Sequence, residues 1–289
     1  MEVDCEGCAG CCIDWRPLAP AASDHERRGA EQPLDDRYNL VPLTCDDVRG
    51  FVDAGYGDAL RPRVWTSTDP DQPTTMIDGR SIVAVDDRPI FMIGMRQPPK
   101  PVGPFGILPR WLRTCVFLDP TTLQCRVHES DLYPESCSTY PAQHLQLDVE
   151  TECERVEEAV GGTRLLDGDV SVESPPLPFG PRAIGWTVFA YPNPDDLLGC
   201  IQRLEDDRVE RADRAKFVAA AAGHSPGSFE VNEIVMDTAI NDVLDASSWI
   251  GTAMESWSQL SAVRRVADPR LARRVEEAQG APGTPGWST

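Results

Sequence analysis

The sequence predicts an α+β protein, in which an irregular, cysteine-rich N-terminal part with short β-hairpins precedes a helical C-terminal part. Two observations support this division. Nine of the ten cysteines lie before residue 161, among segments rich in turn-forming residues. Beyond Pro194, apolar residues recur at helical spacing. We therefore expect an N-terminal domain at residues 1–161, a mainly helical region at 162–280 and a disordered tail at 281–289.

Two local patterns predict the first regular elements. Thr44 followed three residues later by Asp47 is a capping box, which predicts a short helix. Further on, Asp78-Gly79 stands between 74–77 and 81–85, two runs typical of strands. Because Asp-Gly supplies the positive φ angles of a tight turn, these runs are predicted to form a hairpin.

The rest of the N-terminal part alternates strands, loops and one helix. Residues 90–95 are predicted to add a third strand, whereas the proline- and glycine-rich run 97–109 is predicted to be a loop. Residues 115–118 and 123–127, joined by a turn at 119–122, are a second hairpin candidate, which would bring Cys115 and Cys125 toward one end of a two-stranded ribbon. Residues 152–160 carry helical charge pairing and stop at Gly161.

The C-terminal part is predicted to be helical. A proline-rich stretch at 174–181 and a strand-like run at 183–191 precede it. Asn193 is the expected cap of the first helix, with Pro194 in its first turn. Helices are expected within residues 195–207, 208–222 and 229–279, with a break near Pro269.

The composition is strongly acidic. The formal net charge is −20, and 25 of the 27 basic residues are arginine. Acidity, scarce lysine and a hydrophobic fraction of 41% resemble the proteins of halophilic archaea. In molar salt the Debye length is about 3 Å, so the repulsion among these charges would be screened. The charge also argues against electrostatic binding to nucleic acid or to anionic membranes.

The sequence contains neither a predicted membrane-spanning segment nor a signal peptide. The longest apolar stretch, residues 81–95, is interrupted by charged residues at 86–88 and falls short of the about 20 residues that cross a bilayer. The first residues form neither a basic start nor an apolar run. We therefore expect a cytoplasmic protein, whose cysteines do not form disulfides.

The most informative motif is the N-terminal string of Cys5, Cys8, Cys11 and Cys12. Its C-x2-C-x2-C-C spacing allows three thiols to converge on one metal centre, as in bacterial ferredoxins, while C-x2-C alone also occurs in zinc sites. Gly7 and Gly10 permit a tight backbone and amide-to-sulfur hydrogen bonds. Cys11 and Cys12 are expected to point in different directions and so to serve different centres.

Four more cysteines complete a longer pattern. They are Cys115, Cys125, Cys137 and Cys153. In their order, the eight cysteines resemble the YkgJ-type cysteine-cluster family, described as zinc- or iron-chelating proteins. That family has an N-terminal string, a hairpin pair, a cysteine shortly before an aromatic-proline pair, here Tyr140-Pro141, and a last cysteine heading a helix. The resemblance covers residues 1 to about 160.

The sequence departs from the family pattern between the hairpin and the third segment. His128 stands where the family has tyrosine, and Tyr133 stands where it has arginine before proline. This loop is also two residues longer. The departures are compatible with metal binding, but a role of the family's arginine does not carry over to this chain.

The resemblance implies a metal-stapled N-terminal domain in which eight cysteines are the metal ligands. These are Cys5, Cys8, Cys11, Cys12, Cys115, Cys125, Cys137 and Cys153. They suit two four-thiolate sites that hold [4Fe-4S] clusters, zinc or one of each, or a single cluster with spare thiols. We favour iron–sulfur. Cys45 and Cys200 match nothing in the family pattern and are expected to pack in the core.

Other chemistry-bearing residues suggest no second site. His128 is placed to ligate a metal or to bond a sulfur, but is expected to be an exposed histidine at a strand end. The other three histidines are expected to be exposed or structural. The sequence has no phosphate-binding glycine loop and no Ser/His/Asp arrangement. No catalytic residue is therefore assigned.

Three classes of function fit the sequence. The first is a metal-binding protein that acts in electron transfer or as an accessory or structural subunit, because closed four-thiolate sites leave no coordination position for a substrate. The second is a cluster-dependent enzyme, since the family resembles the flagellin lysine methylase, which uses S-adenosylmethionine. The third is a zinc-stapled protein-interaction module. The expected partner is another protein, either a redox partner or the other subunits of a complex.

Overall fold

The computed structural model describes residues 2–21, 23, 25, 30–146, 149–166, 183–263 and 266–286. It is a mixed α and β structure with an antiparallel sheet and C-terminal helices, as predicted. The chain divides into two compact units. Unit 1 comprises Met1–His25, Arg96–Pro175 and Trp249–Thr289, and unit 2 comprises Glu26–Met95 and Pro176–Ser248. These units differ from the expected boundaries because segments far apart in the sequence share one core.

Unit 2 is built on a six-stranded antiparallel sheet. The strands are β2 (Glu31–Pro33), β3 (Leu60–Ser67), β4 (Thr74–Ile77), β5 (Arg80–Val85), β6 (Arg88–Met95) and β10 (Phe189–Ala190). Their order is β10-β6-β3-β5-β4, with β2 also paired to β3. The predicted hairpin is confirmed: Asp78 and Gly79 take positive φ angles of 52° and 75° between β4 and β5. The predicted third strand is confirmed as β6. Of the strand-like run 183–191, only Phe189–Ala190 form a strand, which is β10.

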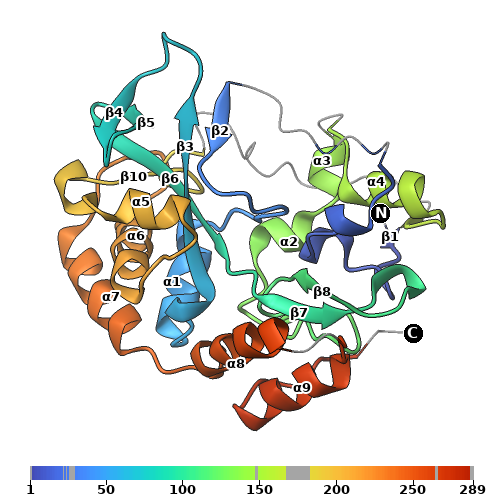
Figure 1. The fold of residues 1–289 in the computed structure, drawn as a ribbon. Helices are drawn as coiled ribbons and strands as arrows, with labels where there is room; N and C mark the ends of the chain where they lie inside the picture. The colour runs from blue at the N-terminus through green and yellow to red at the C-terminus, as the bar shows by residue number, and fades with distance from the viewer. Residues whose placement is uncertain are drawn as a thin grey trace. The chain divides into compact units, whose positions relative to one another are not determined.

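In the described part of unit 2, four α-helices accompany this sheet (Figure 1). They are α1 (Cys45–Asp53), α5 (Cys200–Glu205), α6 (Arg211–Gly223) and α7 (Glu233–Asp245). The Thr44–Asp47 capping box at the start of α1 is confirmed. α6 packs on β3 and β6, where Phe217 meets Phe91 with ring centroids 5.1 Å apart. The predicted helix over 195–207 begins as a 3-10 turn (Pro194–Leu197) capped by Asn193, and α5 starts only after Gly199, whose φ is 78°.

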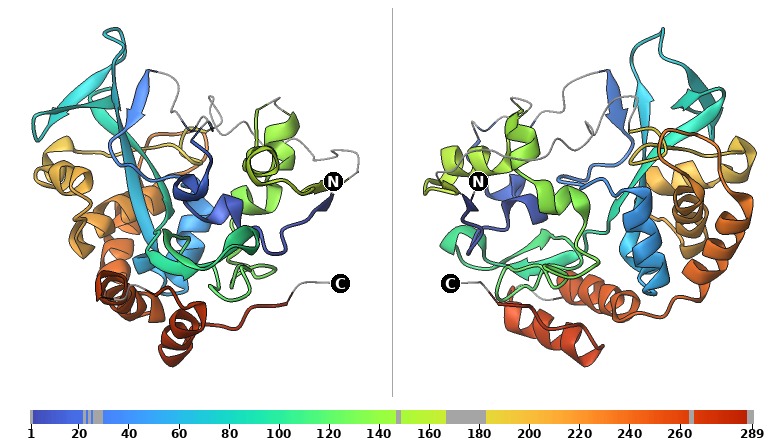
Figure 2. Two further views of the ribbon diagram at one scale, coloured as in Figure 1. Left: turned by 45° about the vertical axis from the view of Figure 1, so that its right-hand side comes forward. Right: turned by 180° about the vertical axis from the view of Figure 1, so that it is seen from behind.

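Unit 1 has two small ribbons and five α-helices among its described residues. The strands are β1 (Glu2–Val3) with β9 (Leu165–Leu166) and β7 (Pro99–Val102) with β8 (Arg110–Arg113). The helices are α2 (Glu135–Thr139), α3 (Ala142–Gln146), α4 (Glu152–Val160), α8 (Trp249–Val263) and α9 (Pro269–Ala278). Helix α4 has the predicted bounds, from a capping box at Thr151 to Gly161. Helices α8 and α9 pack on β7, below the ribbon in Figure 2.

Three expectations for unit 1 were wrong or only partly met. Strand β7 lies inside the run 97–109, which was expected to be a loop. Proline cannot donate a backbone hydrogen bond, yet a two-stranded ribbon has free edges where that donor is not needed. The hairpin expected over 115–127 is reduced to one bridge, Leu118↔Cys125. Part of the expected disordered tail is described, and Gly286 N–H donates to Gln124 Oε1 at 2.9 Å.

The remaining expectations concern segments or features that are only partly described. The proline-rich stretch 174–181 and the tail residues 287–289 lie outside the described residues. Helices α7, α8 and α9 confirm the helical prediction for 229–279, with α9 starting at Pro269. Among the described residues, no helix has the length and apolar character needed to cross a bilayer.

Candidate metal centre

The structure separates the ten cysteines into two groups. The eight that follow the family pattern all belong to unit 1, although about 100 residues divide the N-terminal string from the others. Cys45 and Cys200 belong to unit 2. The name "cysteine cluster" is used here for the eight in unit 1: Cys5, Cys8, Cys11, Cys12, Cys115, Cys125, Cys137 and Cys153.

The N-terminal string folds back on itself as a turn followed by a 3-10 helix at Gly10–Cys12. The backbone N–H of Cys8 donates to Cys5 O at 3.1 Å, and that of Gly10 donates to Cys8 Sγ at 3.4 Å. The second bond is an amide-to-sulfur contact of the kind expected from the sequence. Gly10 is also sterically required, because a Cβ there would lie 2.9 Å from Val156 Cγ2 on helix α4.

Cys11 and Cys12 were expected to point in different directions, but the structure places their sulfur atoms side by side. Their Sγ atoms lie 3.7 Å apart, within the range of a weak thiol hydrogen bond. This contact lowers the pKa of Cys11 and raises the pKa of Cys12 well above its ordinary value. Because these two sulfur atoms are neighbours, any metal centres that the two residues serve would lie next to each other.

The second pair of cysteines lies directly against the string. The backbone N–H of Cys115 donates to Cys12 O at 2.7 Å, and Ile13 pairs with Thr114 in an isolated bridge. Although the predicted hairpin is shorter than expected, it does bring Cys115 and Cys125 together. Burial, followed by the charge of Cys115, raises the pKa of Cys125 to about 12.

Helix α4 brings Cys153 to the string. Trp15 is fully buried, and its Nε1 donates to Glu152 Oε2 at 2.8 Å, which attaches the first turn of α4 to the N-terminal segment. Burial first, and then the charges of Cys11, Cys5 and Cys8, raise the pKa of Cys153. Gly10 of the string lies against Val156, one helical turn beyond Cys153, so Cys153 is carried by the helix face that meets the string.

Two tyrosines line the cysteine cluster, and sequence reasoning assigned neither of them a role. Tyr133 Oη donates to Cys137 O at 3.3 Å, and Tyr140 Oη accepts from the backbone N–H of Glu152. Burial, then the charge of Cys137, raises the pKa of Tyr133. Burial, then the charge of Cys11, raises the pKa of Tyr140. The sequence held one sign of such a role, because Tyr133 stands where the YkgJ-type family pattern has arginine.

The donor chemistry suits a soft or borderline metal, but the side chains are not closed around one. Eight thiols are the ligands that iron–sulfur clusters and structural zinc use. Among the residues that the structure describes, no three His, Cys, Asp or Glu side chains are arranged to hold one metal ion. His128 keeps 40% of its side chain exposed and packs edge-on against Tyr133. Metal binding would therefore require the thiols to rotate and close.

The cysteines outside the cluster are buried, as expected. Cys45 is fully buried in the first turn of α1. Cys200 is buried too, but its contacts are polar: its thiol donates to Asp213 Oδ1 at 3.0 Å, beside Arg203. Hence Cys200 is tied to an ion pair rather than to apolar side chains alone. His224, expected to be exposed or structural, is fully buried and structural, since its Nε2 accepts from the backbone N–H of Ala190.

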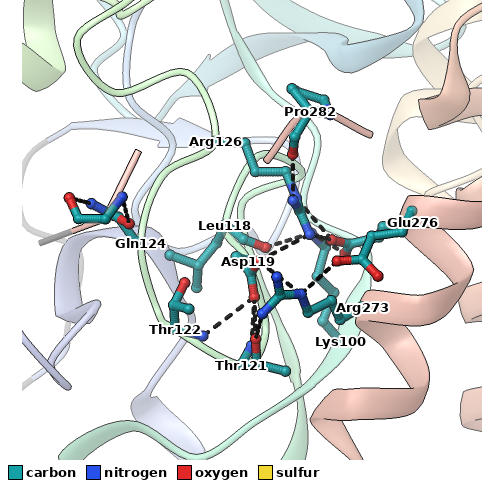
Figure 3. A network of polar contacts seen from close by, with 12 residues as sticks. Lys100, Leu118, Asp119, Thr121, Thr122, Gln124, Arg126, Arg273, Glu276 and Pro282 are labelled. Carbon is teal, nitrogen blue, oxygen red and sulfur yellow. Dashed lines mark hydrogen bonds and ion pairs between the residues drawn. The ribbon is translucent and has the colours of Figure 1, made fainter. Parts of the chain in front are cut away.

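A buried network of charges lies beside the Cys115–Cys125 turn (Figure 3). Lys100 Nζ contacts Glu276 Oε1 at 2.8 Å, and Arg126 Nη2 contacts Glu276 Oε2 at 2.6 Å and Asp119 Oδ2 at 3.1 Å. These four side chains are completely buried. Lys100 Nζ also lies 4.5 Å from the centre of a Trp257 ring. The network joins α9 to β7 and to the turn.

The same network fixes the backbone between the two cysteines. Lys100 Nζ donates to the carbonyl oxygens of Val116 and Leu118 at 2.7 and 2.8 Å. Arg126 Nη1 donates to Pro282 O in the C-terminal segment. Sequence reasoning missed these roles, although Lys100 is one of only two lysines in an arginine-rich chain. A turn that is held this rigidly presents its cysteines at defined positions.

Comparison with known proteins defines the family of the chain. A model described as a family of unknown function, DUF7531, matches residues 1–288, so the chain belongs to that family. No curated protein and no solved structure matches it. The resemblance to the YkgJ-type cysteine-cluster family stays a prediction.

Proposed function

We propose that this protein is a metal-binding cysteine-cluster protein that holds iron–sulfur and serves in electron transfer or as an accessory or structural subunit. The observation that carries the proposal is the gathering of eight thiols, from two segments separated by about 100 residues, in one compact unit. Desolvation and mutual repulsion raise the pKa of six of these thiols, and so disfavour their thiolate form. A bound metal cation would compensate this charge, which gives the clustering a chemical purpose.

Iron–sulfur is preferred to zinc for the N-terminal string. The C-x2-C-x2-C spacing is typical of [4Fe-4S] cradles, and the Gly10 amide already bonds the sulfur of Cys8. The residues that would hold metal are the eight of the cysteine cluster. When bound, a [4Fe-4S] cluster would supply one-electron redox chemistry, and this chain's own residues would supply the thiolates and the amide-to-sulfur hydrogen bond.

The proposed setting is the cytoplasm of a halophilic archaeon, with another protein as partner. The net charge of −20 and the scarcity of lysine support a high-salt solvent. A reducing compartment agrees with thiols that serve as ligands rather than as disulfides. The same charge disfavours nucleic acid as a partner. The unfolding midpoint of the full chain is accordingly expected to rise between 0.1 and about 2 M KCl, as screening relieves repulsion.

Anaerobic purification of the full chain tests the proposal. The expected product is brown, with broad visible absorption that bleaches on reduction by dithionite. A colourless protein that carries only zinc, and that stays colourless after incubation with ferrous iron and sulfide, would overturn the iron–sulfur assignment in favour of a zinc-stapled module. A spectral change on adding S-adenosylmethionine would reveal an open cluster corner and replace the electron-transfer role with the enzymatic one.

A further inference from the structure

We infer that unit 2 contains a binding site for a small oxyanion, such as inorganic phosphate, at a buried group of arginines. This group, called the arginine cluster, consists of Arg37, Arg61 and Arg63 together with Asp35 and Asp207, and all five residues belong to unit 2. The guanidinium of Arg61 would bind the anion. The inference is independent of the metal proposed for unit 1.

The arginine cluster lies on one covered face of the sheet. Side chains alternate along a strand, so Arg61 and Arg63 project from the same face of β3. The cross-strand partner of Arg61 is Gly94, where an added Cβ would lie 2.6 Å from Leu40 Cγ. The segment around Leu40 therefore covers this face beside Arg61, which is only 5% exposed.

Arg61 makes few hydrogen bonds for a buried guanidinium. Its Nη1 donates to Asp207 Oδ1 at the long distance of 3.4 Å. Its Nη2 lies 3.5 Å from Asp35 Oδ2, an ion pair that is not a hydrogen bond. Both Nε and Nη2 are buried and make no hydrogen bond to the described residues. Such donors on a charged group are costly to bury, and a bound anion would remove that cost.

Other arginines of this chain show which ligand these two atoms take. Nε and Nη2 form the edge of the guanidinium that binds a carboxylate or a phosphate through two parallel hydrogen bonds. Among the described residues, five arginines use both atoms on one carboxylate group. They are Arg16, Arg63, Arg80, Arg126 and Arg203. The same edge of Arg61 is therefore suited to an oxyanion.

The two carboxylates of the cluster are engaged by other arginines. Asp35 accepts from Arg63 Nε at 3.3 Å and Nη2 at 2.7 Å, and also from the backbone N–H of Arg37 at 2.8 Å. Asp207 forms an ion pair with Arg37. Burial lowers the pKa of Arg61, and the charge of Asp35 opposes this only in part. An added anion would offset the burial of this positive charge.

The exposure of the cluster limits the size of the anion. The side chain of Asp207 is 43% exposed, so the cluster reaches solvent at this residue. Nε and Nη2 of Arg61 lie deeper and are buried. An anion that binds them must therefore be small enough to be enclosed. A free oxyanion meets this condition, whereas a phosphate group carried by a macromolecule does not.

Calorimetric titration of the full-length protein with potassium phosphate, in about 2 M KCl at pH 7, tests the site. Wild type is expected to bind one phosphate per chain, and because chloride is in excess, this binding would show a preference for an oxyanion. Arg61→Lys keeps the charge but lacks the planar edge, so it should weaken binding at least about 10-fold. Asp207→Asn removes a carboxylate that competes for Arg61 and should tighten binding several-fold.

A matched arginine of unit 2 provides the control. Arg80→Lys should bind phosphate as wild type does, because Glu205 already takes Nε and Nη2 of Arg80. Amide exchange in β3 and β6 reports whether each variant is folded, and Asp207→Asn decides the matter if Arg61→Lys is not. The site would be overturned by folded wild-type protein that binds no phosphate, by equal affinities of Arg61→Lys and Arg80→Lys, or by weaker binding in Asp207→Asn.

Discussion

The two units of this protein are stabilised in different ways. Unit 2 has a six-stranded sheet, and its helix α6 buries ten of 13 residues. In unit 1, helix α4 buries only Val156, and the ribbons have two strands each. Unit 1 instead gathers the eight-thiol cluster and four buried charges. Both units bury an apolar core, with Trp15 and Trp257 in unit 1 and Phe91 and Phe217 in unit 2. In our proposal, unit 1 differs in that it also depends on metal.

Metal removal should produce the largest difference in stability between the two units. Structural metal sites contribute about 10 kcal/mol to the folding of small domains, so chelation under reducing conditions is expected to expose the backbone of unit 1. Amide hydrogen exchange should accelerate at least about 100-fold within residues 5–12 and 115–153, while β3 and β6 retain their protection. Equal loss of protection in both units, or no loss in either, would contradict the comparison.

Breaking the buried charge network should have the next largest effect. Lys100→Met leaves Glu276 with one cation fewer in a fully buried site, which costs about 3–5 kcal/mol of unfolding free energy. Denaturant unfolding of unit 1 measures the change. Lys216→Met, at the only other lysine, is the matched control and should cost less than about 1 kcal/mol, because this side chain is partly exposed. Similar costs for the two substitutions would show that the network does not stabilise unit 1.

A smaller effect is expected where the string meets α4. Gly10→Ala would place a methyl group 2.9 Å from Val156 Cγ2 and should cost about 1–3 kcal/mol through overpacking. Iron retention should fall with it, since Cys8 and Cys11 flank this residue. Gly283→Ala is the control, because nothing lies within 4 Å of its added Cβ. Wild-type stability in Gly10→Ala would show that the contact with α4 is not close.

The smallest effect concerns an ion pair in unit 2 and its dependence on pH. Burial raises the pKa of Asp213, but hydrogen bonds from Arg203 and Cys200 outweigh it and lower that pKa to about 2. A depressed carboxyl pKa adds stability above about pH 4, and this stability is lost as pH falls toward 2. Asp213→Asn should therefore cost about 1–2 kcal/mol at pH 7 and less at pH 3. Denaturant midpoints at the two pH values measure this, and a constant difference would contradict it.

Local rules predicted the elements whose cause is local. The Asp78-Gly79 hairpin and the bounds of α4 follow from turn and cap residues that act within a few positions. The strand β7 could not be predicted in this way, because its prolines are tolerated only in a ribbon that leaves β7 a free edge, and its pairing with β8 is not visible in the sequence of β7 alone. The interleaved units were equally hidden, since they depend on which distant segments meet.

The candidate site likewise has features that the sequence could predict and features that it could not. The order of the cysteines selected the eight that share unit 1 and set aside Cys45 and Cys200. It could not predict that the sulfur atoms of Cys11 and Cys12 lie 3.7 Å apart, because spacing in the sequence does not fix the side-chain rotamers. Nor could it reveal Lys100 and Glu276 as a buried pair, because 176 positions (276 − 100) separate these residues in the sequence.

The central claim is that the cysteine cluster of unit 1 binds metal, and one measurement tests it most directly. Iron, acid-labile sulfide and zinc are quantified per chain in full-length protein purified without oxygen. The account predicts about eight iron and eight sulfide per chain, as two [4Fe-4S] clusters require. Less than one equivalent of every metal, in protein that is folded and has been offered iron, sulfide and zinc, would contradict it.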